Sequence, residues 1–295
     1  MPSHVAGEPA TSITSTGTKS AGPIVRMTDL HKSFGTQHVL RGVQLSIQSG
    51  RTRVIMGPSG CGKSVLLKHM VGLLRPDRGE VWYEDQRVDT LAEIDLVPIR
   101  RQFGFLFQQG ALFDSMSVRE NIEFPLQEHS KLTHEEREER VRRVLRMVGL
   151  EDVINKMPAD LSGGQRKRIA LARAIVLEPN VILYDEPTTG LDPIRSDVIN
   201  ELIIKLQHSL HVTSVVVTHD LTSAFKVGDR MVMMHGGRIL FEGTPQEMRQ
   251  TDDPIVRRFL MGQASAEELA AIRDGAGVQP AHRNGENGAA EDDAR

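Results

Sequence analysis

The sequence predicts an α/β fold whose central sheet is mainly parallel and carries an inserted set of helices. Short apolar runs alternate along the chain with stretches of helical periodicity, which is typical of strand–helix–strand units. Several runs, such as 181–184 and 214–218, contain no charged residue, as expected for strands buried on both faces of a sheet. From about residue 128 to 175 the helical patterns follow one another without a convincing strand, so we expect a helical subdomain there.

The individual elements follow from local patterns. Apolar runs predict strands at Thr52–Met56, Glu80–Tyr83, Phe103–Phe107, Val181–Tyr184, Ser214–Thr218, Met231–Met234 and Arg238–Phe241. Helical periodicity predicts helices at Lys63–Leu74, Glu135–Val148, Gln165–Leu177 and Asp197–Gln207. Thr133 and Glu136 have the spacing of a capping box, and Thr244, Pro245 and Glu247 form a second helix start of this kind.

Composition and charge limit what the chain can be. With 295 residues, of which 39% are apolar and 25% charged, the chain can bury a substantial core. The 36 basic and 39 acidic side chains give a net charge of −3, which argues against a nucleic-acid partner held on a basic face. A single cysteine, Cys61, excludes an internal disulfide and fits a reducing compartment.

The two ends differ from the middle of the chain. Residues 1–23 and 263–295 are rich in small and polar residues without apolar periodicity, so we expect both to be largely disordered. The folded domain is expected at 24–262. No apolar run reaches the ~20 residues of a membrane span, and the first twenty residues lack the apolar segment of a signal peptide. We therefore expect a cytoplasmic location.

Residues 57–64 form a glycine-rich loop between an expected strand and an expected helix. Its members are Gly57, Pro58, Ser59, Gly60, Cys61, Gly62, Lys63 and Ser64. Glycines let backbone N–H groups close around an anion, and the following helix N-terminus adds free donors and the positive end of a dipole. Lys63 can reach the β- and γ-phosphates of a nucleotide, and Ser64 can bind Mg²⁺. The alternative is a glycine-rich turn that merely contains a lysine.

Two acids, Asp185 and Glu186, end the apolar run that starts at Val181. Asp185 can hold the metal through water, and Glu186 can polarise or deprotonate the attacking water. The alternative is a pair of acids on a solvated loop that caps the next helix. A phosphate loop in the same chain favours the catalytic interpretation.

A second helix start of special composition lies at 161–165, Leu-Ser-Gly-Gly-Gln. Ser162 and Gln165 have the spacing of a capping box, and this alone is the plain interpretation. Gly163 and Gly164 serve no capping purpose, but they leave N–H groups bare for the approach of an anion. Because a nucleotide has one γ-phosphate, both helix starts can be used if two copies meet head to tail. We therefore predict a two-fold homodimer with two composite sites.

Together these segments resemble the nucleotide-binding subunit of an ATP-binding-cassette (ABC) transporter. The resemblance covers the whole expected domain and implies a P-loop NTPase fold with an antiparallel β subdomain, and ATP and Mg²⁺ as cofactors. It also implies a role for Phe34 in stacking on adenine, for Gln108 in sensing Mg²⁺ and water, for Asp192 in a loop that crosses the dimer, and for His219 in contacting the γ-phosphate. Val65 stands where many relatives have Thr, a position of secondary importance.

The implied catalytic residues are thus Glu186, His219, Lys63 and Gln108, and the implied metal ligands are Ser64, Gln108 and Asp185. Cys61 in the phosphate loop and the basic run at 166–168 each have an interpretation of their own. The thiol of Cys61 lies near a helix N-terminus, where its pKa can fall, although a tolerated small residue is the alternative. The run Arg166-Lys167-Arg168 is interpreted as a solvated helix face.

The segment 108–129 indicates which transporter is involved. Its residues 110–113, 115–116, 121, 124–126 and 128–129, together with 191–194 and 253–262, resemble the ATPases of the Mla/Mce lipid-trafficking systems. This resemblance implies a phospholipid or related lipid cargo, a separate permease that docks near Gln108–Leu126, a Mce-domain lipid-binding subunit and a place on the cytoplasmic face of the inner membrane.

Three other functions compete with this one. An importer motor for a small polar solute such as an amino acid would carry the same cassette motifs. A soluble cassette ATPase that acts on ribosomes or DNA usually has two cassettes or a long coiled coil, which this chain lacks. A binding module without hydrolysis is disfavoured by the presence of Glu186 and His219.

Overall fold

The computed structural model describes residues 22–264 and 269–270 and confirms the expected α/β fold. The expectations for most of 1–23 and 263–295 therefore fall outside the described residues. The strands are β1 (Pro23–Phe34), β2 (Gln37–Gln48), β3 (Thr52–Met56), β4 (Arg78–Tyr83), β5 (Gln86–Arg87), β6 (Phe103–Leu106), β7 (Val181–Asp185), β8 (Thr213–Val217), β9 (Arg230–His235) and β10 (Arg238–Gly243). The α-helices are α1 (Lys63–Met70), α2 (Glu93–Arg100), α3 (Val118–His129), α4 (His134–Val148), α5 (Gly163–Ile175), α6 (Pro193–Leu210), α7 (Leu221–Val227), α8 (Pro245–Gln250) and α9 (Pro254–Leu260).

The central sheet has the strand order β10-β9-β3-β8-β7-β6. All neighbours in it are parallel except the β9–β10 pair. Because the sheet is parallel, the carboxyl ends of β3, β6, β7 and β8 share one edge. The phosphate loop follows β3 and the acid pair lies at the end of β7, so the fold brings these two distant segments to the same edge.

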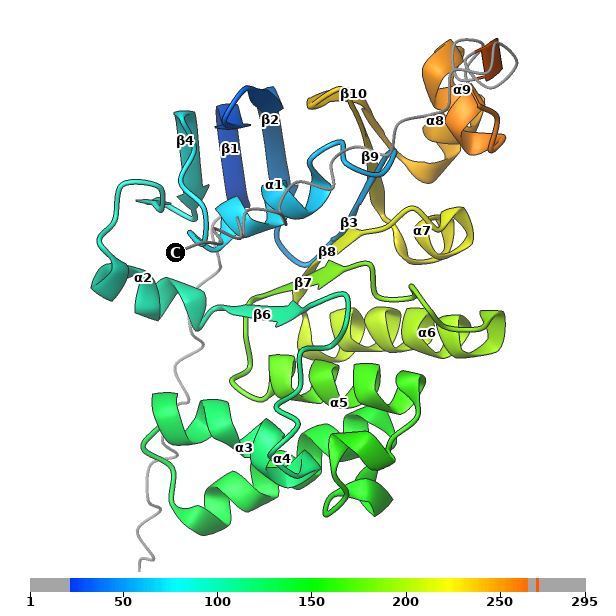
Figure 1. The fold of residues 1–295 in the computed structure, drawn as a ribbon. Coiled ribbons are helices and arrows are strands. Elements are labelled where there is room, and N and C mark those ends of the chain that lie inside the picture. Colours follow the sequence, from blue (N-terminus) through cyan, green and yellow to red (C-terminus); the bar gives the residue numbers. More distant parts are fainter. Residues whose placement is uncertain (1–21, 265–268, 271–295) are drawn as a thin grey trace, which may run out of the picture.

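A second, antiparallel sheet has the order β2-β1-β4-β5. Figure 1 shows it in blue and cyan, with α1 between this sheet and the central strands. The long β1–β2 hairpin was not among the expected strands. Its burial pattern explains why: Arg26, Lys32 and Arg41 interrupt the apolar positions, since only one face of the hairpin packs inward.

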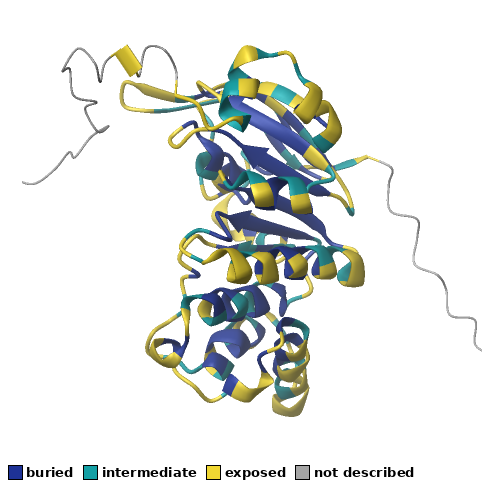
Figure 2. Cartoon of the chain, turned by 90° about the vertical axis from the view of Figure 1, so that its right-hand side faces the viewer, coloured by how far each residue is buried: buried dark blue, intermediate teal, exposed yellow. Residues whose placement is uncertain are grey.

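Apolar side chains fill both faces of the central sheet. Successive residues of β3 point to opposite sides, so that Val54 and Met56 join one core and Ile55 joins the other. The first core packs against α5 and α6, and the second contains Leu66 and Leu67 of α1. Figure 2 shows this arrangement as dark blue strands between helices that expose only their outer sides. The sheet is therefore a rigid support for the loops at its edge.

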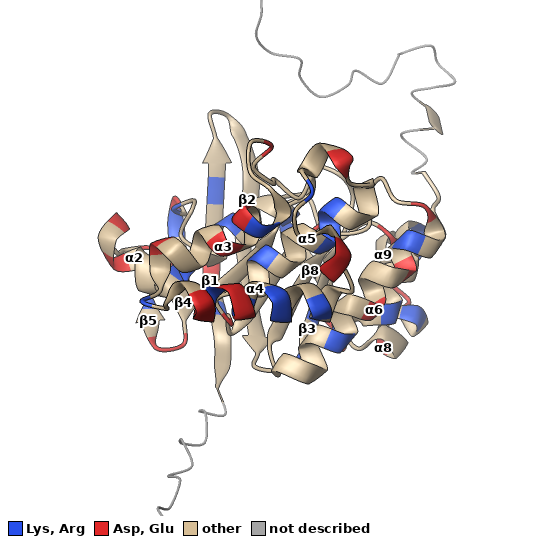
Figure 3. Cartoon of the chain, turned by 90° about the horizontal axis from the view of Figure 1, so that it is seen from below, with Lys and Arg blue, Asp and Glu red and all other residues tan. Residues whose placement is uncertain are grey.

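The helical part is built from α3, α4 and α5, which pack on one another below the sheet in Figure 1. Its helices begin at Val118, before the expected start near residue 128. The capping boxes expected at Thr133/Glu136 and Thr244/Glu247 are both present. Both basic and acidic residues are coloured along the α4 ribbon in Figure 3. Among them, Arg142 pairs with Glu138 and Arg146 with Glu139. These exposed pairs add little stability, since water screens them.

Candidate nucleotide-binding and catalytic site

The phosphate loop joins β3 to α1 and needs glycine for steric reasons. Gly57 has φ 147°, and a Cβ there would lie 2.2 Å from the carbonyl oxygen of Met234. Gly62 has φ 105° and is the N-cap of α1, where no side chain caps the helix. The first-turn N–H groups of α1 therefore have no capping side chain and can bind an anion.

The ammonium group of Lys63 lies inside this loop. Its Nζ donates to the carbonyl oxygens of Gly57, at 2.8 Å, and Pro58, at 3.0 Å. The residue is only 7% exposed. Its positive charge therefore lies inside the loop, beside the free N–H groups at the N-terminus of α1. The loop thus combines backbone donors with a buried cation, which is the chemistry that polyphosphate binding requires.

Ser64 and Asp185 meet although they come from α1 and β7. The Ser64 hydroxyl donates to Asp185 Oδ1 at 2.9 Å. Burial raises the pKa of the Asp185 carboxyl, and the Ser64 bond partly opposes this effect. A hydroxyl and a carboxylate beside a phosphate loop suit Mg²⁺, which takes one or two protein oxygens together with nucleotide phosphates. In the described ranges no group of three or more His, Cys, Asp or Glu residues forms a metal cage.

Glu186 is held in a strained backbone conformation directly after β7. Its φ is 52°, a value that is uncommon for a residue with a side chain. The backbone N–H donates to Val217 of β8 at 2.9 Å. The side chain is 12% exposed, and its Oε2 accepts from Thr189 Oγ1 at 3.2 Å and lies 2.9 Å from His219 Nδ1. The structure therefore brings together Glu186 and His219, two of the residues that the sequence indicated.

The loop after Glu186 is held by Lys167 of α5. Lys167 of α5 was expected on a solvated face, but it is 7% exposed. Its Nζ donates to the carbonyl oxygens of Glu186, Pro187 and Thr189. That expectation is wrong because Lys167 lies three and four residues before Ala170 and Leu171 on the buried stripe of α5.

The second helix start has the geometry that its composition indicated. The Ser162 hydroxyl accepts from Gln165 N, and Gln165 Oε1 accepts from Ser162 N at 2.9 Å. Neither Gly163 nor Gly164 has a positive φ, and an added Cβ would meet nothing closer than 3.8 Å and 3.5 Å, respectively. Neither the backbone conformation nor an overlap with an added Cβ therefore requires glycine at these two positions within this chain.

Of the remaining indicated residues, three are exposed and one, Val65, is half-buried. Phe34 ends β1 with 47% exposure, and the Lys32 ammonium lies 5.6 Å from its ring centroid. Gln108 is exposed in the turn after β6, and Asp192 caps α6 by accepting from Arg195 N at 2.9 Å. Val65 is half-buried on α1. No contact in the described residues joins Gln108 to Ser64 or Asp185 within this chain.

Burial of Cys61 opposes the effect that a helix N-terminus has on a thiol. The residue is 9% exposed, and burial raises the pKa of its thiol, with Lys63 only partly opposing this effect. A raised pKa leaves less thiolate at neutral pH. Of the two interpretations of Cys61, the structure favours a tolerated small residue.

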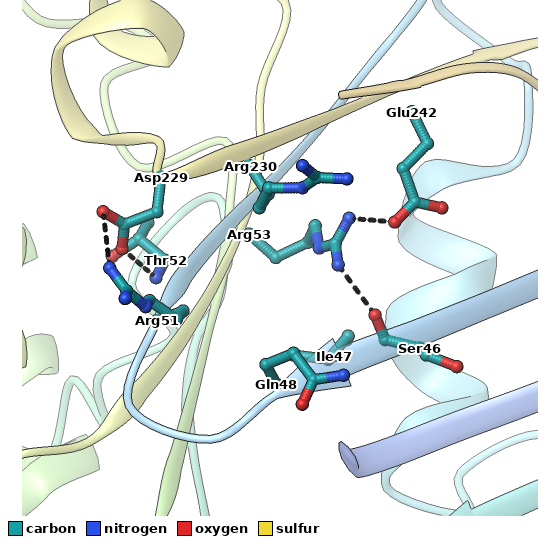
Figure 4. A pocket seen from close by; sticks show the side chains of 9 residues that line it. All are labelled: Ser46, Ile47, Gln48, Arg51, Thr52, Arg53, Asp229, Arg230 and Glu242. Carbon is teal, nitrogen blue, oxygen red and sulfur yellow. Dashed lines mark hydrogen bonds and ion pairs between the residues drawn. The ribbon is translucent and has the colours of Figure 1, made fainter. Parts of the chain in front are cut away.

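Two cavities lie at opposite ends of β3. A cleft of about 870 Å³ is lined by Gly57, Pro58, Ser59 and His219, and by residues of α9. The other, of about 410 Å³, surrounds Arg53 at the start of β3 (Figure 4). There the Arg53 guanidinium is already paired with Glu242 and bonded to the Ser46 carbonyl. The cleft of about 870 Å³ is the one of these two that adjoins the phosphate loop.

Comparisons with known proteins decide which family has this site. The family model described as ABC transporter matches residues 40–189. The chain is 40% identical over 247 residues to the probable ribonucleotide transport ATP-binding protein mkl of Mycobacterium leprae, covering 84% of this chain and 71% of that protein. The chain belongs to the ABC transporter family.

Other members of the ABC family are similar to this chain over most of its length. The chloroplastic protein TRIGALACTOSYLDIACYLGLYCEROL 3 of Arabidopsis thaliana is 40% identical, with 81% of this chain and 74% of that protein covered. The intermembrane phospholipid transport system ATP-binding protein MlaF of Escherichia coli is 37% identical, with 83% and 91% covered. The ATP-binding cassette MJ0796, a dimer in a post-hydrolysis state with ADP and Pi, has a TM-score of 0.70 and 36% identity, with 75% and 98% covered.

These findings confirm the expected enzyme class. This ABC chain binds ATP and is an ATPase coupled to transport. ABC ATPases dimerise and work with membrane permease subunits, at the periphery of the membrane. In the described part of this chain, no helix is both long enough and apolar enough to cross a membrane.

Proposed function

We propose that two copies of this chain bind two ATP molecules head to tail and hydrolyse them to energise lipid transport through a separate permease. The observation that carries the catalytic part is Glu186. Its carboxylate lies at the sheet edge that also bears the phosphate loop, and contacts with Val217, Thr189 and His219 hold its backbone and side chain. In each composite site, Lys63 and the α1 N-terminus of one copy face Ser162, Gly163 and Gly164 of the other.

Each residue has a definite task in this mechanism. Residues 57–62 and the free N–H groups of α1 bind the phosphates, and Lys63 turns from its loop carbonyls towards the γ-phosphate. Ser64 and Asp185, with Gln108 completing the set on closure, are suited to hold Mg²⁺, which neutralises phosphate charge when bound. Glu186 accepts a proton from the attacking water, and His219 keeps the carboxylate oriented and contacts the γ-phosphate. Phe34 stacks on adenine, and Asp192 lies at the dimer boundary.

The assignment of a lipid cargo depends on similar proteins and not on the geometry of the nucleotide site. The names of two similar proteins refer to phospholipid transport or to a glycolipid, whereas the Mycobacterium leprae relative is named for ribonucleotides. The segment 108–129 has the pattern of the Mla/Mce ATPases, which favours lipid. The comparisons do not favour the alternative of an importer motor for a small polar solute.

The permease is proposed to dock on the segment from Gln108 to Leu126. Phe113 is 42% exposed there, although its loop is rigid. The Asn121 side chain bonds Phe113 N, Phe113 O and Met116 O, and Arg173 of α5 donates to the carbonyls of Gly110 and Ala111. A displacement of this loop therefore also displaces α5, whose N-terminus contacts the nucleotide of the partner copy. We place the ATPase on the cytoplasmic face of the inner membrane and propose a Mce-domain protein as a third subunit.

The cargo can be tested with the assembled complex. Full-length chain is purified from native membranes with its bound proteins and lipids, which are identified by mass spectrometry. We expect a permease with bound phospholipid, and ATP-dependent transfer of a fluorescent phospholipid after reconstitution into phosphatidylcholine vesicles. The same complex with Lys63→Ala is the control and should show no transfer. Stimulation of ATPase activity by a ribonucleotide or an amino acid, with no effect of phospholipid, would contradict the lipid assignment.

A further inference from the structure

Lys167 connects helix α5, which begins at the Ser162 cap, with the loop that follows β7 and contains Glu186. Its Nζ lies 2.7 Å from the carbonyl oxygen of Thr189, 2.8 Å from that of Pro187 and 3.3 Å from that of Glu186. An ammonium group has three N–H donors, so these contacts use all of them. The bonds join α5 to the loop that follows β7.

Within the described part of the chain, Lys167 forms no direct ion pair. Burial lowers the pKa of its ammonium to about 8, and the Glu186 carboxylate opposes this effect. At neutral pH the side chain therefore still carries its proton and can donate to all three carbonyls. A buried ammonium is costly unless it is fully hydrogen-bonded, and here the acceptors are backbone atoms that only a correctly folded loop presents.

The loop that Lys167 holds is the one that fixes Glu186. Glu186 combines a φ of 52° with a following proline, and both features are unfavourable for a residue with a side chain. Thr189, whose carbonyl accepts the shortest Lys167 bond, also donates its hydroxyl to Glu186 Oε2. Lys167 therefore contacts both the backbone of Glu186 and the residue that orients its carboxylate.

The other end of the connection is the start of α5. Ser162 caps this helix, and one and a half turns separate the cap from Lys167. We propose that Lys167 is a positioning residue that makes the N-terminus of α5 and the Glu186 loop one rigid unit. When Ser162 and Gly163 close on the nucleotide bound by the partner copy, this rigid unit moves as a whole. The movement places the Glu186 carboxylate relative to the nucleotide that the same chain binds. This inference rests on the proposed head-to-tail dimer.

The substitution Lys167→Met tests the proposal, because it keeps the length and the apolar stem but removes the charge and all three donors. We expect kcat for ATP in the full-length chain to fall by about 10²-fold, the order expected for a misplaced catalytic group. KM should stay within roughly threefold, because the phosphate loop is untouched. Lys167→Gln keeps two N–H donors and should give an intermediate kcat.

Lys205→Met is the matched control. Lys205 Nζ also donates to a backbone carbonyl, that of Met147 at 2.9 Å, but it lies on α6 away from Glu186. This variant should have wild-type kcat. A wild-type kcat for Lys167→Met, or an equal fall in both lysine variants, would overturn the proposal. If Lys167→Met does not fold, Lys167→Gln decides: reduced kcat at unchanged KM supports the role, and wild-type kcat refutes it.

A failure of this inference can be told apart from a failure of the proposed function. Glu186→Gln is measured in the same assay. If it hydrolyses ATP at the wild-type rate, the proposed mechanism is wrong. If Glu186→Gln is inactive while Lys167→Met has wild-type kcat, only the role of Lys167 is wrong.

Discussion

Replacing Glu186 by glutamine is expected to leave ATP binding intact while lowering hydrolysis by about 10²–10⁴-fold, the usual contribution of a general base. The glutamine side chain has the same size and can still accept from Thr189 Oγ1, which lies 3.2 Å from Glu186 Oε2. The neutral amide, however, cannot take a proton from water. Because the γ-phosphate then stays in place, each composite site stays filled and the dimer stays closed.

The measurement has two parts. Phosphate release gives the rate, and sedimentation with ATP and Mg²⁺ gives the mass, which should be that of the dimer for Glu186→Gln. Glu201→Gln is the control. Glu201 lies on α6 and forms an exposed ion pair with Lys226 of α7, so this variant should have wild-type behaviour. A Glu186→Gln variant that sediments as a monomer with bound ATP contradicts the stalled dimer.

Replacing Gly163 by aspartate should separate folding from function, because the two effects have opposite signs. A carboxylate in the first turn of α5 interacts favourably with the helix dipole, by about 0.3–1 kcal/mol. An added Cβ at Gly163 meets only Leu191 Cδ2, at 3.8 Å. The chain should therefore fold at least as stably as the wild type. The same charge would face the partner's γ-phosphate, and a like-charge contact of this kind costs several kcal/mol.

We expect ATP-driven dimerisation and hydrolysis by Gly163→Asp to fall by at least about 10²-fold, the equivalent of ~3 kcal/mol. Gly163→Asn is nearly isosteric but neutral, and it should retain clearly more activity. Thermal unfolding checks the stability of both variants. Equal hydrolysis by the aspartate and asparagine variants would mean that no phosphate approaches this helix start.

The parts of the site that were predicted from the sequence are those fixed by local backbone chemistry. The phosphate loop and the capping boxes depend on residues that are neighbours in the chain, so their types and spacing suffice. Ser64 and Asp185 were each predicted as metal ligands, and the structure adds that the two side chains are in contact. Lys167 was missed because its acceptors lie about twenty residues further along the chain. Its position on the apolar stripe of α5 was the available signal.

The elements that were missed have mixed patterns. The hairpin of β1 and β2 exposes one face and carries charged residues within its apolar alternation. Helices α2 and α3 contain Pro98 and Pro125, which interrupt a helical pattern. For α3 a local signal was present, since Ser117 and Glu120 form a capping box. Tertiary packing determines the secondary structure of such segments, and local sequence patterns do not reveal that packing.

In the proposed mechanism, each ATP is hydrolysed between two copies of the chain. The most direct test measures hydrolysis per chain over a range of protein concentrations, with the dimer fraction at each concentration taken from sedimentation in ATP and Mg²⁺. We expect the activity per chain to rise in proportion to the dimer fraction and to vanish as the chain becomes monomeric. A sample that is entirely monomeric and still hydrolyses ATP at the full rate would contradict it.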